Sequence, residues 1–99
     1  MFLRGAFKLM KNLYGIVKVS KFFPEEEIHI EKHIKYYKLE GKKFGIRIVE
    51  RDRMKREKIE IENITDNEEK IDKVLTELVV KEIRPQASDV IEDLIKIYV

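Results

Sequence analysis

The two histidines of the chain are four positions apart, a spacing whose chemistry depends on the local structure. In a helix, His29 and His33 would lie on one face and Glu26 would add a carboxylate one turn earlier, a ligand set that suits a transition metal. In a strand, the two rings would share a face but lie about 13 Å apart, too far for one ion. Residues 28–40 alternate isoleucines with polar residues and end at a turn around Gly41. We therefore expect a strand and no metal site, with the helix as the alternative.

Groups suited to catalysis are sparse. The chain has no cysteine, and Ser20 and Ser88 lack the glycine-flanked setting of a nucleophile elbow. The acidic runs at 25–27 and 68–69 fit a turn and a helix N-terminus better than an acid–base pair. The four glycines form no phosphate-binding loop. We expect a protein that is not an enzyme, without catalytic residues, cofactor or bound metal.

The densest group of basic residues lies at the tip of a predicted hairpin, between positions 51 and 58. A basic hairpin can contact the phosphates of a nucleic acid. However, Asp52 and Glu57 dilute the positive charge, and no aromatic residue is interleaved for stacking on bases. A solvated turn is the favoured interpretation, and nucleic-acid binding is the alternative. The candidate contacts to an anion or a nucleic acid are Arg51, Arg53, Lys55, Arg56 and Lys58.

The first residues separate into an apolar side and a basic side when they are placed on a helix at 100° per residue. This pattern predicts an amphipathic helix over residues 2–14, an N-terminal extension that packs on the domain's own sheet or on a second copy. The alternative is a basic amphipathic helix that lies on an anionic membrane or on a partner, and of these two interpretations we do not expect binding to a membrane surface. The residues expected to face a partner are Phe2, Leu3, Phe7, Met10 and Leu13.

The rest of the chain predicts four strands followed by two helices. β-Branched residues predict a strand over Tyr14–Phe23, and alternation predicts strands over 28–40, 44–49 and 59–62. Apolar residues at helical spacing predict one helix from about residue 65 and another after Pro85. The expected strand pairs are Ile48 with Ile59, Arg47 with Glu60 and Leu39 with Phe44, with a β-bulge near residues 35–36.

These elements define the expected fold as α+β. It consists of the N-terminal amphipathic helix, an antiparallel four-stranded meander and two C-terminal helices packed on one sheet face. A single domain is expected over residues 1–99, because no repeat or Gly/Pro/Ser-rich linker interrupts the chain. The residues expected to form the core are Ile46, Ile48, Ile59, Ile61, Ile71, Leu75, Leu78, Ile91 and Leu94.

Several short segments resemble one family of proteins. They are Tyr36–Glu40, Phe44–Ile48, Ile61–Thr65, Ile83–Pro85 and Asp89–Asp93. Over about residues 28–96 the chain resembles an uncharacterised family of short bacterial proteins, many of them from anaerobic spore-formers. The resemblance supports the strand over 28–40 and implies no activity, cofactor or catalytic residue. Residues 1–14 lie outside it.

Composition bounds the class of protein. The 99 residues are 43% hydrophobic and 40% charged with a net charge of only +2, which excludes a polyanion-binding protein of the kind evident from net charge alone. No apolar run approaches the length of a membrane span, and the abundance of charge with few amides is typical of thermophile proteins. We expect a cytoplasmic, non-catalytic protein-interaction or regulatory module that forms a homo-oligomer or binds a protein partner. The alternative is a nucleic-acid-binding protein that uses the N-terminal helix and the 51–58 hairpin tip.

Overall fold

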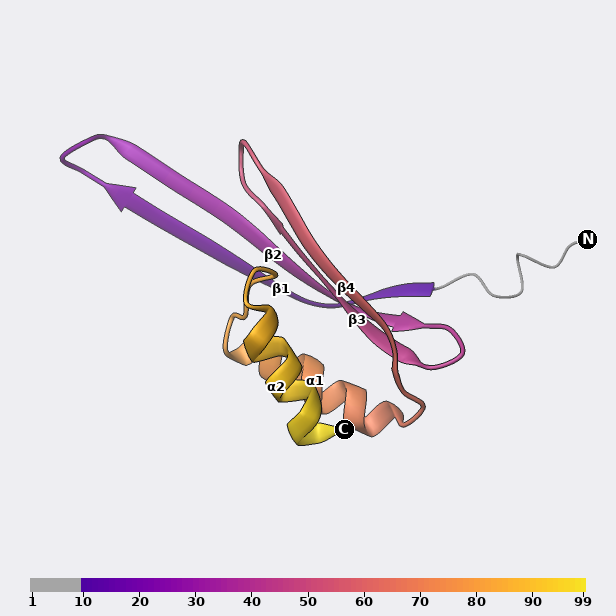
Figure 1. Cartoon of the computed structure of the whole chain (residues 1–99). Coiled ribbons are helices and arrows are strands. Elements are labelled where there is room, and N and C mark those ends of the chain that lie inside the picture. The colour runs from indigo at the N-terminus through magenta and orange to yellow at the C-terminus, as the bar shows by residue number, and fades with distance from the viewer. Residues whose placement is uncertain (1–9) are drawn as a thin grey trace, which may run out of the picture.

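A computed structural model describes residues 10–99 and shows an α+β arrangement (Figure 1). Four strands form one antiparallel sheet in the order β1-β2-β3-β4, and two helices follow them. The predicted meander and the two C-terminal helices are therefore confirmed. The elements are β1 (Met10–Phe23), β2 (Ile28–Glu40), β3 (Phe44–Arg51), β4 (Arg56–Thr65), α1 (Glu68–Val80) and α2 (Ser88–Tyr98).

The predicted N-terminal helix is wrong over residues 10–14, which belong to strand β1. Met10 pairs with Glu40 and Leu13 pairs with Tyr37, so this segment is hydrogen-bonded into the sheet. A β-bulge between Leu13 and Gly15 disturbs the two-residue alternation, and the disturbed pattern also matches a helical one. Met10 and Leu13, 62% and 52% exposed, are therefore strand residues rather than a helix face. The remainder of the predicted helix, including Phe2, Leu3 and Phe7, lies outside the described residues.

The strand register confirms one predicted hairpin and corrects the other. In β3–β4, Ile48 pairs with Ile59 and Arg47 with Glu60, as alternation and loop length predict. In β2–β3, Leu39 pairs with Gly45 rather than with Phe44. The loop between these strands is only residues 41–43, because β2 continues to Glu40. The pairing from His33 to Glu40 is continuous, so the β-bulge predicted near residues 35–36 is absent from it.

Both helices pack on the same face of the sheet, where the core lies. The predicted core residues of β3, α1 and α2 are buried, whereas Ile59 and Ile61 at the β4 edge are only partly buried. Strand β2 adds Ile34 and Tyr36, which had not been predicted, and the Tyr36 hydroxyl donates to the Ile83 carbonyl oxygen at 2.8 Å. Burial raises the pKa of Tyr36 well above its ordinary value, so the hydroxyl keeps its proton for this bond.

Two ion-pair clusters hold the helical layer on the sheet. Lys38 Nζ lies 2.7 Å from a Glu68 carboxylate oxygen and 2.9 Å from one of Asp72. Arg84 lies in the segment between the two helices, and its guanidinium donates two hydrogen bonds, of 2.6 and 2.7 Å, to the carboxylate of Glu50 on β3. These bonds lower the pKa of Glu50 against the opposing effect of its burial. Lys38 and Glu50 on the helix-covered face are thus each paired with charged groups of the helical layer.

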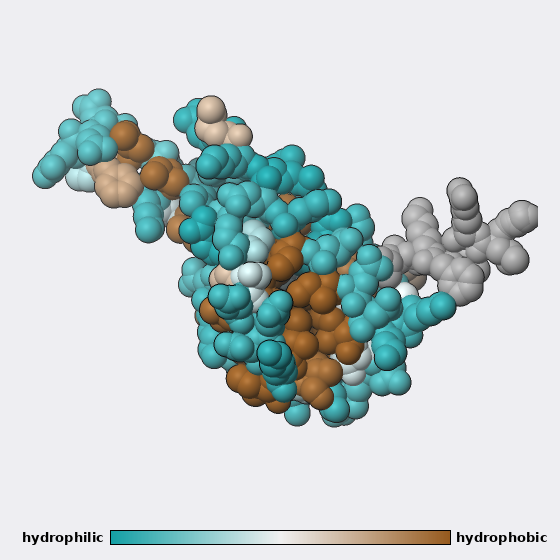
Figure 2. All heavy atoms as spheres, viewed as in Figure 1, coloured by the Kyte–Doolittle hydropathy of each residue, from teal (hydrophilic) through white to brown (hydrophobic). Residues whose placement is uncertain are grey.

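One end of the β1–β2 hairpin extends beyond the helices and the other strands (Figure 1). The last pair between β2 and β3 is His33 with Arg51, so residues 28–32 of β2 pair only with residues 19–23 of β1. We call residues 19–32 the arm. Figure 2 shows apolar side chains along the arm and hydrophilic ones at its end. Its exposed large apolar residues are Phe22, Phe23, Ile28 and Ile30.

Candidate functional site

The sheet face opposite the helices, which we call the open face, carries a row of basic side chains that crosses all four strands. The register aligns Lys18 on β1 with His33 on β2, His33 with Arg51 on β3, and Arg51 with Arg56 on β4. Residues directly opposite one another in a sheet project from the same face. We call these four residues the basic row. Neighbouring strands lie about 4.8 Å apart, so the row spans about 14 Å across the sheet.

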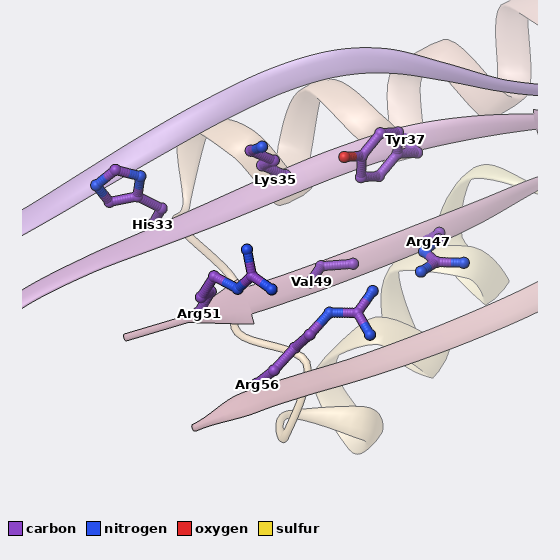
Figure 3. A pocket seen from close by; sticks show the side chains of 7 residues that line it. All are labelled: His33, Lys35, Tyr37, Arg47, Val49, Arg51 and Arg56. Atoms are coloured by element: carbon purple, nitrogen blue, oxygen red, sulfur yellow. The ribbon is translucent and has the colours of Figure 1, made fainter. Parts of the chain in front are cut away.

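The next rows continue this surface along the strands. Two residues further from the arm, Lys35 and Lys58 flank Val49, and beyond them Tyr37 and Glu60 flank Arg47. Figure 3 shows Lys35, Tyr37, Arg47 and Val49 on the same side of the sheet, with the helices behind it. With three members of the basic row they enclose a hollow of about 280 Å³, whose lining residues are His33, Lys35, Tyr37, Arg47, Val49, Arg51 and Arg56.

The positive charge of this face is largely uncompensated. Within residues 10–99, none of Lys18, Lys35, Arg51 and Arg56 takes part in an ion pair. Arg47 is the exception, since its guanidinium lies 3.1 Å from a Glu60 carboxylate oxygen. Like charges directly opposite one another destabilise a sheet. A ligand with several negative charges would remove that repulsion, so the face is chemically suited to bind an anion.

The carboxylate of the loop between Arg51 and Arg56 is engaged within that loop. The Asp52 carboxylate accepts hydrogen bonds from the backbone N–H groups of Met54 and Lys55, each at 2.7 Å. These bonds lower the pKa of Asp52 and fix the loop that joins β3 to β4. The loop thus holds its only carboxylate in its own backbone and leaves the two arginines without a counter-charge.

The structure brings together only part of the predicted anion-contact group. Arg51, Arg56 and Lys58 lie on the open face, whereas Arg53 and Lys55 lie in the loop at the hairpin tip. The prediction missed Lys18, His33, Lys35 and Arg47, which reach this face from β1, β2 and β3. The sequence does contain a signal for two of them, since His33 and Lys35 are two residues apart in a predicted strand and therefore share a face.

The histidines do not form a metal site with each other. His29 Nε2 lies 2.8 Å from the Ser20 hydroxyl, and His33 Nε2 lies 3.6 Å from a Glu31 carboxylate oxygen. Four strand residues separate the two rings by about 13 Å. In the part of the chain that the structure covers, no cluster of three or more His, Asp or Glu side chains could hold a metal ion. Within that same part, neither helix is long and apolar enough to cross a membrane.

Comparison with known proteins identifies one family. A family model described as Family of unknown function (DUF6514) matches residues 22–97, from the end of β1 to the end of α2. No curated protein and no solved structure matches the chain. The matched region contains most of the open face, including His33, Arg51 and Arg56, whereas Lys18 precedes it.

Proposed function

The chain belongs to the DUF6514 family of unknown function, and we propose that it is a non-catalytic module that binds nucleic acid on the open face of its sheet. The observation that carries this proposal is the basic row, in which Lys18, His33, Arg51 and Arg56 stand side by side. No element of the described chain covers this row, and no carboxylate pairs with its lysine or its arginines.

The dimensions of the basic surface favour a polyanion over a small anion. The basic row spans about 14 Å, and the row formed by Lys35, Val49 and Lys58 lies about 7 Å further along the strands. A single phosphate could contact only one or two of these side chains at a time. A nucleic-acid backbone presents successive phosphates, which can engage Arg51, Arg56 and Lys35 together, and arginine suits bidentate phosphate contacts. Tyr37, on the same face, supplies an aromatic ring beside the basic residues.

This proposal revises which residues supply the contacts. Of the predicted contacts, Arg51, Arg56 and Lys58 lie on the sheet and remain part of the proposed surface, whereas Arg53 and Lys55 lie in the loop. The proposed surface therefore extends from β4 to β1 and does not depend on residues 1–9. Recognition through phosphates predicts binding with little sequence preference and strong dependence on salt.

A titration with labelled DNA tests the proposal. Fluorescence anisotropy is measured with a single-stranded and a double-stranded oligonucleotide at increasing salt. For the variant with Arg51→Ser and Arg56→Ser we expect a loss of affinity of about tenfold or more at low salt. On duplex DNA, each phosphate contact that is removed should reduce the slope of log K against log salt by about 0.9.

A matched variant controls for net charge. Arg53→Ser with Lys55→Ser removes the same charge from the adjacent loop, and we expect it to bind nearly as tightly as the wild type. The proposal is overturned if the wild-type protein binds neither oligonucleotide at low salt. An equal loss of affinity in both variants would also contradict it, because binding would then depend on overall charge rather than on the row.

A further inference from the structure

The end of the arm carries negative charge that contrasts with the open face. Residues 22–31 contain four glutamates and no lysine or arginine, and all four glutamates are exposed. Glu25, Glu26 and Glu27 form the turn between β1 and β2, in which the Glu26 N–H donates to the Phe23 carbonyl oxygen at 3.2 Å. We call residues 24–27 the acidic tip. It is a compact group of carboxylates held at the end of a two-stranded ribbon.

The acidic tip cannot neutralise the basic row of its own chain. Glu27 is six residues before His33 on the same hairpin, and six residues of extended chain span about 20 Å. The tip and two members of the row, Lys18 and His33, belong to one continuous β-hairpin, so the ribbon itself keeps the tip away from the row. The tip and the row therefore both remain accessible to another molecule.

We propose that the acidic tip of one copy docks on the basic row of a second copy, and that this self-association competes with nucleic acid for the open face. The inference rests on the proposed function for the role of the row, but the docking itself rests on charge complementarity alone. A two-fold arrangement with the two open faces opposed and the arms antiparallel forms the contact twice, since each chain supplies one tip and one row. Such an interface closes and leaves neither charged patch free.

An apolar residue supports the same arrangement. Phe22 pairs with His29, four residues beyond the Lys18–His33 pair, and therefore projects from the open face. Its side chain is 60% exposed. With each tip over the partner's row, Phe22 of each chain comes over the middle of the partner's arm, beside the partner's Phe22 and near the two-fold axis. Burial of this ring adds apolar contact to the pairing of charges.

Complementary charge reversals test the docking. One variant reverses the tip (Glu25→Lys, Glu26→Lys and Glu27→Lys) and another reverses the row (Arg51→Glu and Arg56→Glu). Alone, each variant opposes like charges at both contacts and should sediment as a monomer. In a mixture, the lysine tip meets the glutamate row and the native glutamate tip meets the native row, so a heterodimer should form.

Analytical ultracentrifugation at low salt measures the outcome, and circular dichroism confirms that each variant is folded. We expect the wild type to dimerise and its dissociation constant to rise about tenfold or more at high salt. The docking is overturned if the wild type is monomeric at low salt, if either variant dimerises like the wild type, or if the mixture stays monomeric.

A third variant separates the docking from the proposed function. With Glu25→Gln, Glu26→Gln and Glu27→Gln the tip is neutral and the row is intact, so we expect a monomer that binds oligonucleotides more tightly than the wild type. If the charge-swapped mixture dimerises but no variant binds nucleic acid, the proposed function fails and the docking stands. If the row variant loses nucleic-acid binding but no form of the chain associates, the docking fails and the proposed function stands.

Discussion

Arg51 on β3 stands directly opposite Arg56 on β4, and both side chains project from the sheet face that the helices leave open (Figure 3). His33 stands opposite Arg51 on its other side, so Arg51 has a basic neighbour on each flank. The only carboxylate in the loop between the two arginines, that of Asp52, accepts backbone hydrogen bonds within that loop. The arrangement concentrates positive charge on this face, and the repulsion expected within it is the physical basis of the proposed ligand binding.

Removal of one arginine from this pair should stabilise the free protein. For Arg56→Thr we expect the free energy of unfolding to rise by about 0.2–1 kcal/mol, because the like-charge contact is lost and threonine suits a strand. Lys58→Thr is the matched control, since Lys58 stands opposite Val49 and not opposite a cation. Urea unfolding followed by circular dichroism measures both. Equal gains in the two variants would show that the arginine pair carries no repulsion.

The Glu50–Arg84 pair should stabilise the fold by holding the segment between the helices on β3. Arg84→Ala leaves the Glu50 carboxylate, whose side chain is 6% exposed, with Lys32 at 3.8 Å as its remaining charged partner. We expect the free energy of unfolding to fall by about 1.5–3 kcal/mol. In the double variant Glu50→Gln with Arg84→Ala, part of the loss should be recovered, because no buried charge then lacks its partner. Additive losses would contradict this coupling.

The same pair predicts a stability that depends on pH in the acidic range. The folded-state pKa of Glu50 is lowered, first by the hydrogen bonds from Arg84. The stabilisation is therefore fully present above the unfolded-state pKa of about 4.3, and it is lost as the pH falls through the lower folded-state pKa. Thermal unfolding of wild type and Glu50→Gln between pH 7 and pH 3 measures this loss. The difference between the two proteins should shrink below about pH 4, and a constant difference would refute the assignment.

Gly45 should tolerate no side chain, for a reason specific to the β3–β4 pairing. A Cβ at this position would lie 2.3 Å from the Ile61 carbonyl oxygen and 3.0 Å from the Glu62 Cα, both backbone atoms. We expect Gly45→Ala to lower the free energy of unfolding by about 1–3 kcal/mol. Gly15→Ala is the control, since its Cβ would meet the Val79 side chain at 3.0 Å, which can adjust. Equal effects on the unfolding transition would exclude this explanation.

Sequence patterns predicted best those features that depend on one hairpin at a time. Alternation placed Ile46 and Ile48 on the face of Ile59 and Ile61, and the short loop then set the β3–β4 register. The β2–β3 register failed because it depends on where β2 ends, and the pattern does not distinguish a three-residue loop from a four-residue one. Over residues 10–14 the disturbed alternation of a bulged strand and the period of an amphipathic helix fit the same apolar residues, and pairing with β2 decides between them.

The basic row could not be predicted in full for the same reason. Its four members come from four strands, so their alignment depends on three registers at once. The predicted β3–β4 register already implied that Arg51 faces Arg56. Lys18 and His33 could be added only from the β1–β2 and β2–β3 registers, and one of these was predicted incorrectly. Residues that are far apart in the sequence and belong to different hairpins therefore require the structure itself.

The change in environment along β2 has a consequence for how the molecule opens. From His33 onward this strand lies between two others and over the helices, whereas its first five residues, Ile28–Lys32, are bonded to β1 alone. Backbone amides in the arm should therefore exchange with solvent deuterium through local fraying, and those near Tyr36 only when the whole domain unfolds. The chain should thus behave as two cooperative units joined within one strand. A molecule held at the acidic tip would first be detected as slower exchange in the arm, while the core protection factors stayed the same.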